Sequence, residues 1–343
     1  MISVCDVNIL LKEIEKEYKL KSNQNIELFP KYRFHTGIND LCLNAFARVL
    51  CNLVNKTEPN DIFSVYFYVD KSSSSNKKEI KKISITSNLN QKGVKDKMKT
   101  LIEFLQHNST KNLNTNIIKA FFEHILEKEE VVGNGLLQTK QYKKTTKLSC
   151  NLGFKDSDDF FAKLEGNEIT GSSFKKLAYF QDLVLIFLSK DYYNYASVSD
   201  DVFTYKSIEN MHSETLLAIT NSGRINEYIG ISKLCCPFCQ KVLQLLGFSF
   251  RGGHNRYYNC LNNWEICVNN NLLSQDLLNN DFIKNIYNWL FNVKEKLHGR
   301  ISLNEIFSAR ELEAKPFDTT RFYKKYEEID DIKLLYNNYF LSK

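Results

Sequence analysis

The sequence has no long apolar run, and this absence excludes a membrane-spanning helix. Such a helix needs ~18 or more consecutive apolar residues, whereas the nearest approach, at 183–188, is only LVLIFL. The N-terminus also lacks the basic leader, apolar stretch and small-residue cleavage site of a Sec signal peptide. We therefore expect a protein without a membrane anchor that is cytoplasmic, or secreted into a host cell by a route without a Sec signal.

Cysteine is too sparse for a disulfide framework, with nine residues in 343 and therefore an odd number. Five of the nine lie between Cys235 and Cys267, which suits reduced thiols that partly serve to hold a metal. The proportions of apolar (43%) and charged (25%) residues are ordinary for a folded protein. The net charge of +6 permits binding to a polyanion without requiring it.

The spacing of apolar residues predicts a chain that is mainly helical, with one early hairpin. A helix is expected over 38–56 because apolar residues recur on one face. The segments 62–69 and 80–87 are rich in β-branched and aromatic residues and predict two antiparallel strands joined by a polar loop. Helical patterns dominate from 93 to about 205 and again after 270.

Between these helical regions the pattern alternates. HSETLLAIT, at 212–220, predicts a short helix, and EYIGIS, at 227–232, predicts a strand. CPFCQKVLQLL, at 236–246, predicts a second helix, since Pro237 suits a first helical position and Gly247 suits the residue after the end. FSFRGG follows as a strand.

His212, Cys236 and Cys239 have the types and spacing of zinc ligands. A catalytic zinc usually has three protein ligands and a water, which it activates near neutral pH. Two cysteines three residues apart at a helix N-terminus direct both sulfurs into the same space, where the helix dipole favours thiolates. Glu214 would carry protons beside the metal, and H-x-E followed by C-x-x-C is the signature of zinc deaminases.

Other interpretations of these cysteines stay open. The usual signature has proline before its first cysteine, but here Cys235 stands there, so either Cys235 or Cys236 is the ligand. Cys236 is favoured because it gives the C-x-x-C spacing. C-x-x-C alone also fits a redox pair, or half of a structural zinc knuckle completed by Cys260, Cys267 or His254.

YIGISKLCCPFCQKVL and FSFRGGHNRYYNCLNNW resemble the Orientia-type toxin branch of nucleic-acid and nucleotide deaminases, within the cytidine deaminase-like superfamily. The specific resemblance covers about Met211 to Trp264. It implies an α/β fold, a cytidine deaminase-like three-layer α/β/α sandwich with a mixed sheet and large helical additions. The helices that carry H-x-E and C-x-x-C would lie side by side.

The resemblance also implies a domain layout, because two antiparallel strands precede the H-x-E helix in the superfamily. Residues 61–270 are expected to form the deaminase-like core, with a helical insertion at about 93–205. An N-terminal helical segment (1–60) and a C-terminal helical region (271–343) flank this core. The rival arrangement is an independent N-terminal domain, with the strands found nearer DVFTY.

Four further residues are candidate substrate contacts by their family positions. Asn88 follows the second strand and would contact the sugar of the substrate, or is only a turn residue. His254 would touch a phosphate or the base, or only tie down its loop. Tyr257 would stack on the base. Lys233 would attract a phosphate, unless it is a solvated surface lysine.

The function that these features favour is hydrolytic deamination of a cytosine-type base in nucleic acid or in a nucleotide, with Zn²⁺ as cofactor. The residues do not distinguish cytosine from adenine, a polymer from a free nucleotide, or DNA from RNA. The alternatives are a zinc-stabilised scaffold that binds a partner protein without catalysis, and an enzyme that acts on a protein side-chain amide. Membership of a toxin branch implies an effector with a host or immunity protein as partner.

Overall fold

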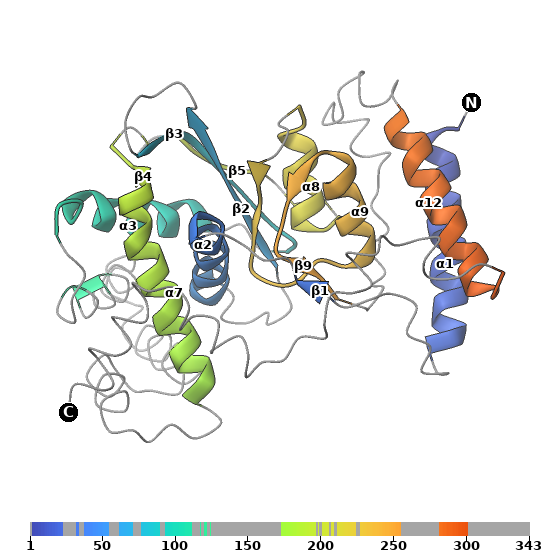
Figure 1. Cartoon of the computed structure of the whole chain (residues 1–343), viewed down its shortest axis with the longest axis horizontal. Helices are drawn as coiled ribbons and strands as arrows, with labels where there is room; N and C mark the ends of the chain where they lie inside the picture. Colours follow the sequence, from blue (N-terminus) through green and yellow to red (C-terminus); the bar gives the residue numbers. More distant parts are fainter. Residues whose placement is uncertain are drawn as a thin grey trace, which may run out of the picture.

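The computed structural model describes residues 2–22, 32–33, 38–54, 62–70, 77–89, 93–111, 117, 120–121, 124, 173–196, 198, 201–205, 207–208, 211–223, 227–254 and 281–300 (Figure 1). The helices within these ranges are α1 (Val4–Ser22), α2 (Ile38–Val54), α3 (Val94–His107), α7 (Ser173–Tyr192), α8 (Ser213–Thr220), α9 (Pro237–Leu245) and α12 (Asp281–Leu297). The strands are β1 (Tyr32–Arg33), β2 (Phe63–Asp70), β3 (Lys78–Ser87), β4 (Tyr193–Asn194), β5 (Val202–Thr204), β6 (Glu227–Tyr228), β7 (Gly230–Ile231), β8 (Phe248–Ser249) and β9 (Gly252–Gly253).

The hairpin of β2 and β3 forms the centre of a mixed sheet. The two strands pair antiparallel, with a register shift between Tyr68 and Val69. On its other edge β2 pairs antiparallel with β7, while β3 pairs parallel with β4 and β5. The predicted hairpin is therefore confirmed, and so is its place in the same sheet as part of the strand expected over 227–232.

The stretch from 193 to 204 differs from the helical structure of the main interpretation. It contains β4 and β5, and both pair with β3; β5 lies within DVFTY, where the rival arrangement expected strands. Val202 stands opposite Ile83, and both side chains are buried in the same core cluster. Burial of Val202 against the core favours a strand at this position. The strand has only three residues, so the sequence shows no recognisable alternation there. The domain boundaries, including the insertion over 93–205, stay a prediction.

Two further strand pairs involve the chain on either side of α9. The strand β6, one residue before β7, pairs parallel with β8, and the amide of Ile229 between them donates to the carbonyl of Ser249 at 3.0 Å. The strand β9 pairs antiparallel with β1, and its Gly253 forms a parallel bridge with Cys235. The chain on either side of α9 is thus tied together next to the cysteines.

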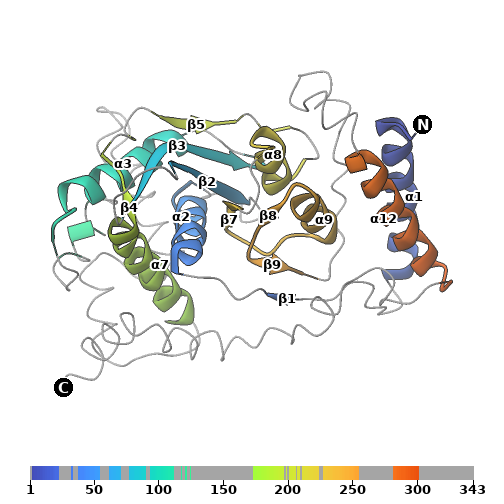
Figure 2. The ribbon, with the colours of Figure 1, turned by 45° about the horizontal axis from the view of Figure 1, so that its top comes forward.

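Side chains of β2 alternate between two buried clusters. Phe63, Val65 and Phe67 pack in one cluster with α2, α3 and α7, whereas Tyr66 packs in the other with α8, α9, α1 and α12. Figures 1 and 2 accordingly show α2, α3 and α7 on one side of β2, α8 and α9 on the other, and α1 and α12 beyond them. The chain is therefore of the α/β class, with a mixed sheet and helices, and this is compatible with the predicted deaminase-like fold.

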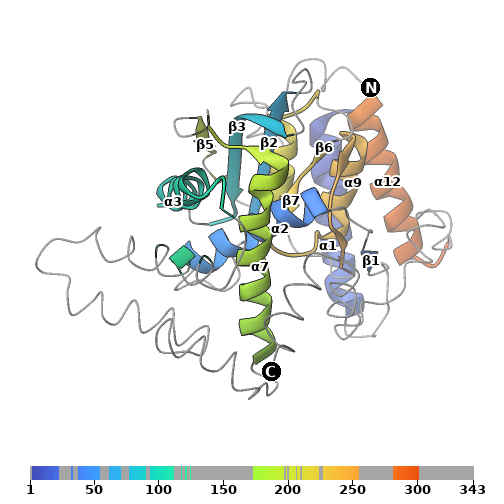
Figure 3. The same cartoon turned by 60° about the vertical axis from the view of Figure 1, so that its left-hand side comes forward.

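The N-terminal and C-terminal described helices pack against each other, as the rotated view in Figure 3 also shows. Lys294 of α12 donates to Glu13 of α1 at 2.9 Å, and the His298 ring lies 2.8 Å from the Glu17 carboxylate. None of the helices within the described ranges has the length and apolarity that a membrane span requires.

The helix α2 lies very close to β7. An added Cβ at Gly230 would come within 2.4 Å of the backbone of Leu43. Asn44, fully buried on the same helix, accepts a hydrogen bond from the amide of Ile231 at 3.0 Å and donates to the hydroxyl of Tyr228 at 2.7 Å. The glycine therefore permits the close approach, and Asn44 fixes the strand along α2.

We expect Gly230→Ala to destabilise the fold by about 3 kcal/mol, because the new methyl group meets backbone that cannot rotate away. Gly299→Ala is the matched control, since its Cβ would meet open space and only its φ of 73° is unfavourable; that strain costs about 1 kcal/mol. Urea denaturation of both variants checks this. An equal loss of stability in the two variants would contradict the close packing of Gly230 against the backbone of Leu43.

Candidate metal centre and active site

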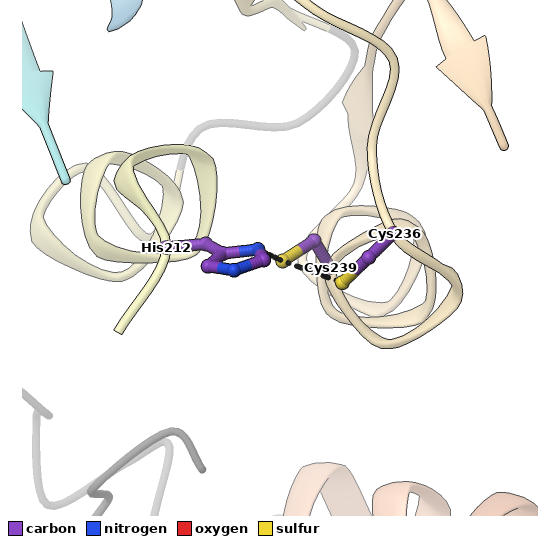
Figure 4. A group of neighbouring side chains, drawn as sticks. All are labelled: His212, Cys236 and Cys239. Carbon is purple, nitrogen blue, oxygen red and sulfur yellow. Dashed lines mark hydrogen bonds between the residues drawn. The ribbon is translucent and has the colours of Figure 1, made fainter. Parts of the chain in front are cut away.

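The helix α8 starts at a point that β3 determines. His212 is the N-cap residue, with extended backbone (φ −72°, ψ 146°), and its side chain points toward Cys239 (Figure 4). The capping hydrogen bond comes from another part of the chain, because the amide of Ser213 donates to Asn88 Oδ1 at 2.6 Å. Asn88, the residue after β3, therefore lies at the N-terminus of the H-x-E helix.

Two hydroxyl groups of the sheet hold the first turn of α8 in place. Thr86 Oγ1 donates to the carbonyl of Ser213 at 2.7 Å, and Ser64 Oγ lies 2.9 Å from Ser213 Oγ. All three side chains are buried. Because the hydroxyls of Ser64, Thr86 and Ser213 each find a partner, they secure the helix at little cost in desolvation.

The helix α9 presents two sulfurs from its first turn. It begins after Cys236, which is extended (φ −72°, ψ 160°), and Pro237 occupies the first helical position as predicted. Cys239 follows one turn later, and its Sγ lies 3.3 Å from Cys236 Sγ. Both cysteines are buried.

The N-termini of α8 and α9 bring three soft donor atoms together. Cys239 Sγ lies 3.3 Å from His212 Nδ1, and the donor atoms of His212, Cys236 and Cys239 all lie within 4.8 Å of one another (Figure 4). Zinc bonds of about 2.0–2.3 Å in a tetrahedron place neighbouring donors roughly 3.5–3.8 Å apart. Two sulfurs and one imidazole nitrogen are also the donors that zinc prefers. The chemistry and spacing of these residues therefore fit a zinc ion.

Glu214 lies beside His212, Cys236 and Cys239 but is not one of these three possible metal ligands, which are called the donor group below. Its side chain is fully buried, and its Oε2 accepts a hydrogen bond from Ser213 Oγ at 3.2 Å. Its Oε1 lies 3.7 Å from His212 Nδ1 and has no hydrogen-bond partner among the described residues. Buried carboxylate oxygens are normally satisfied, so this atom is available to a substrate or a water.

Cys235 is fixed by hydrogen bonds of its backbone and is not a member of the donor group found among the described residues. Its amide donates to the carbonyl of Gly252 at 3.1 Å, and its own carbonyl accepts from the amide of His254 at 3.0 Å. Burial, and then the nearby Glu214 carboxylate, raise the pKa of the Cys235 thiol well above its usual range. Within the described chain, the cysteine that accompanies Cys239 and His212 is Cys236.

The remaining predicted substrate contacts lie around this centre or beyond the described chain. His254 is half-buried, directly after β9, and its backbone is tied to Cys235. Lys233 is half-buried in the bend after β7. Neither belongs to the donor group found in the described part of the chain. Tyr257 lies outside the described residues, as do Cys260 and Cys267 of the zinc-knuckle alternative.

Several contributors to the site were missed by sequence reasoning. Ser64, Thr86 and Ser213 secure α8, and Thr215 Oγ1 donates to Cys239 Sγ at 3.1 Å. A signal was present in ISITS, where isoleucines that face one core alternate with hydroxyl residues. Buried hydroxyls on the opposite face of a strand favour a polar contact there, and Thr86 makes one with α8.

Residues 209–267 match the family model described as OTT_1508-like deaminase. The matched stretch contains α8, α9 and all three donor residues. It supports a deaminase family, and with it a hydrolytic enzyme, whereas the Orientia-type toxin branch stays a prediction. Comparison with curated proteins and with solved structures gave no match.

We expect the purified protein to bind about one zinc ion per chain, because three soft donors converge at one point. Cys236→Ala should lose most of this zinc, whereas Cys235→Ala should keep it, since Cys235 Sγ lies outside the donor group of the described residues. Metal analysis by mass spectrometry after dialysis checks both variants. Zinc lost from Cys235→Ala and kept by Cys236→Ala would reverse the assignment.

Proposed function

We propose that the protein is a zinc-dependent deaminase that hydrolyses the exocyclic amine of a cytosine-type base in nucleic acid or in a nucleotide. His212, Cys236 and Cys239 would hold the zinc. The proposal is supported most directly by Glu214 Oε1, a buried atom beside these donors that no other described residue satisfies. A purely structural zinc site needs its ligands but not a neighbouring carboxylate with an available oxygen.

Zinc, when bound, supplies a water that is activated near neutral pH. Glu214 would take up one proton of the attacking water at Oε1 and pass it to the ring nitrogen, and would then carry the second proton from the new hydroxyl to the amine, so that a C–O bond forms, the C–N bond breaks and ammonia leaves. Ser213 holds Oε2 and thereby directs Oε1 toward the donors.

The proposal includes a fold and a set of substrate contacts. The two buried clusters against opposite faces of β2 support a cytidine deaminase-like three-layer α/β/α sandwich. Asn88, His254, Tyr257 and Lys233 would surround the substrate, and Asn88 has the best support because its side chain lies at the start of α8. We further propose a toxin or effector role, with a host or immunity protein as partner.

Glu214→Gln tests whether the protein is an enzyme. The amide keeps the shape of the side chain but does not carry the proton, so turnover should fall by roughly 100- to 10,000-fold or more. Zinc content and thermal stability should stay near those of the wild type. Deamination is measured as ammonia release from cytidine and adenosine nucleotides and from single- and double-stranded DNA and RNA.

The control for this experiment is Glu79→Gln, which removes a carboxylate of β3 that pairs with Lys81. This variant should retain full activity. A wild-type protein that is inactive on every substrate and yet binds zinc would favour the scaffold alternative. Loss of zinc from Glu214→Gln would instead make Glu214 a structural residue.

Asn88 variants separate a cap from a substrate contact. Asn88→Asp keeps an oxygen that accepts from Ser213 and adds a charge that the N-terminus of a helix favours, so stability should be retained. Asn88→Ala removes the cap and should cost about 1 kcal/mol of stability. If the amide group of Asn88 also binds the substrate, KM should rise in both variants. An unchanged KM in a stable Asn88→Asp protein would restrict Asn88 to its capping role.

A further inference from the structure

We propose that Thr215 is a positioning residue of the metal centre, whose hydroxyl holds the sulfur of Cys239 in the orientation that zinc requires. This inference rests on the proposed zinc centre and adds a residue that lies outside its ligand set. Thr215 is fully buried, and its Oγ1 lies 3.1 Å from Cys239 Sγ.

Thr215 is the third residue of α8, so no residue of this helix lies a full turn before it. Threonine hydroxyls further along a helix often donate to a carbonyl one turn earlier. Thr220 does so, because its Oγ1 donates to the carbonyls of Leu216 and Leu217 at 2.9 and 3.1 Å. Thr215 instead donates across to α9, which makes the contact a link between the two helices that carry the donors.

His212, the N-cap residue, and Thr215, in the first turn of α8, both approach the same sulfur. His212 Nδ1 is 3.3 Å and Thr215 Oγ1 is 3.1 Å from Cys239 Sγ. The position of this sulfur relative to α8 is therefore fixed by a hydroxyl as well as by the imidazole.

Thr215 is not one of the three residues that would hold the metal, so its hydroxyl contacts Cys239 Sγ without taking the place of a ligand. Groups that hydrogen-bond to metal ligands orient them, and their removal typically lowers metal affinity by about 10- to 100-fold.

Thr215→Val tests the proposal, because valine keeps the branched shape and removes only the hydroxyl. We expect its zinc affinity, measured by competition with a chromophoric chelator under reducing conditions, to fall by about 10- to 100-fold. Thr215→Ser, which keeps a hydroxyl, should bind zinc nearly as well as the wild type. Thr220→Val is the matched control on the same helix and should leave zinc affinity unchanged.

Cobalt provides a second readout that a purely structural role would not alter. The sulfur-to-cobalt absorption band of the Co²⁺-substituted protein should shift in Thr215→Val and stay in place in Thr220→Val. If Thr215→Val does not fold, Thr215→Ser and Thr215→Ala differ by the hydroxyl alone and repeat the comparison.

The outcomes separate this inference from the proposed function. Wild-type zinc affinity and an unshifted cobalt band in Thr215→Val would overturn the role of Thr215 and leave the deaminase proposal intact. A Thr215→Ser protein as weak as Thr215→Val would also overturn it, since packing of the methyl group would then be the cause. A wild-type protein that binds no zinc would overturn the metal centre itself. Neither measurement requires turnover, so an inactive protein that binds zinc still tests Thr215.

Discussion

The amide of Ser213 donates to Asn88, and this hydrogen bond, with the hydroxyl contacts of Thr86 and Ser64 beside it, sets the point at which α8 begins. The remaining geometry of the site depends on that point. One residue earlier the chain is extended and directs His212 toward α9. One residue later the first helical turn buries Glu214. A shift of the helix start by one residue would rotate these side chains by about 100° around the helix axis and separate them.

The sheet serves different purposes on its two faces. Phe63 and Val65 of β2 and Ile85 of β3 fill an apolar cluster with α2, α3 and α7, where burial of hydrocarbon stabilises the fold. On the opposite face, the hydroxyls of Ser64 and Thr86 contact α8. The apolar face therefore provides a rigid base, and the polar face positions the helix that carries the H-x-E motif.

Local patterns in the sequence predicted a large part of this arrangement. Pro237 and the periodicity after it gave the start of α9, and the β-branched residues gave the hairpin. The H-x-E and C-x-x-C motifs predicted that His212, Cys236 and Cys239 lie close together, and the structure brings these three residues together. The main interpretation expected helix where β5 lies, because three residues are too few to show a period, although the rival arrangement placed strands nearer DVFTY. The local pattern did not give the contacts of Asn88 with Ser213 or of Asn44 with Ile231, because their partners are more than a hundred positions away and only the folded chain brings them together.

The burial of the Glu214 side chain is energetically unfavourable for the fold. Transfer of a carboxylate into a buried position costs several kcal/mol unless hydrogen bonds or an opposite charge offset it. Ser213 supplies one hydrogen bond to Oε2, whereas the described structure offers none to Oε1. A hydrophobic side chain would fill the same volume without this cost. The burial of a carboxylate here therefore supports the proposed role of Glu214 in proton transfer. A divalent cation on His212, Cys236 and Cys239 would place positive charge beside Oε1 and offset part of the cost. Metal binding at these residues and the burial of Glu214 would thus stabilise each other.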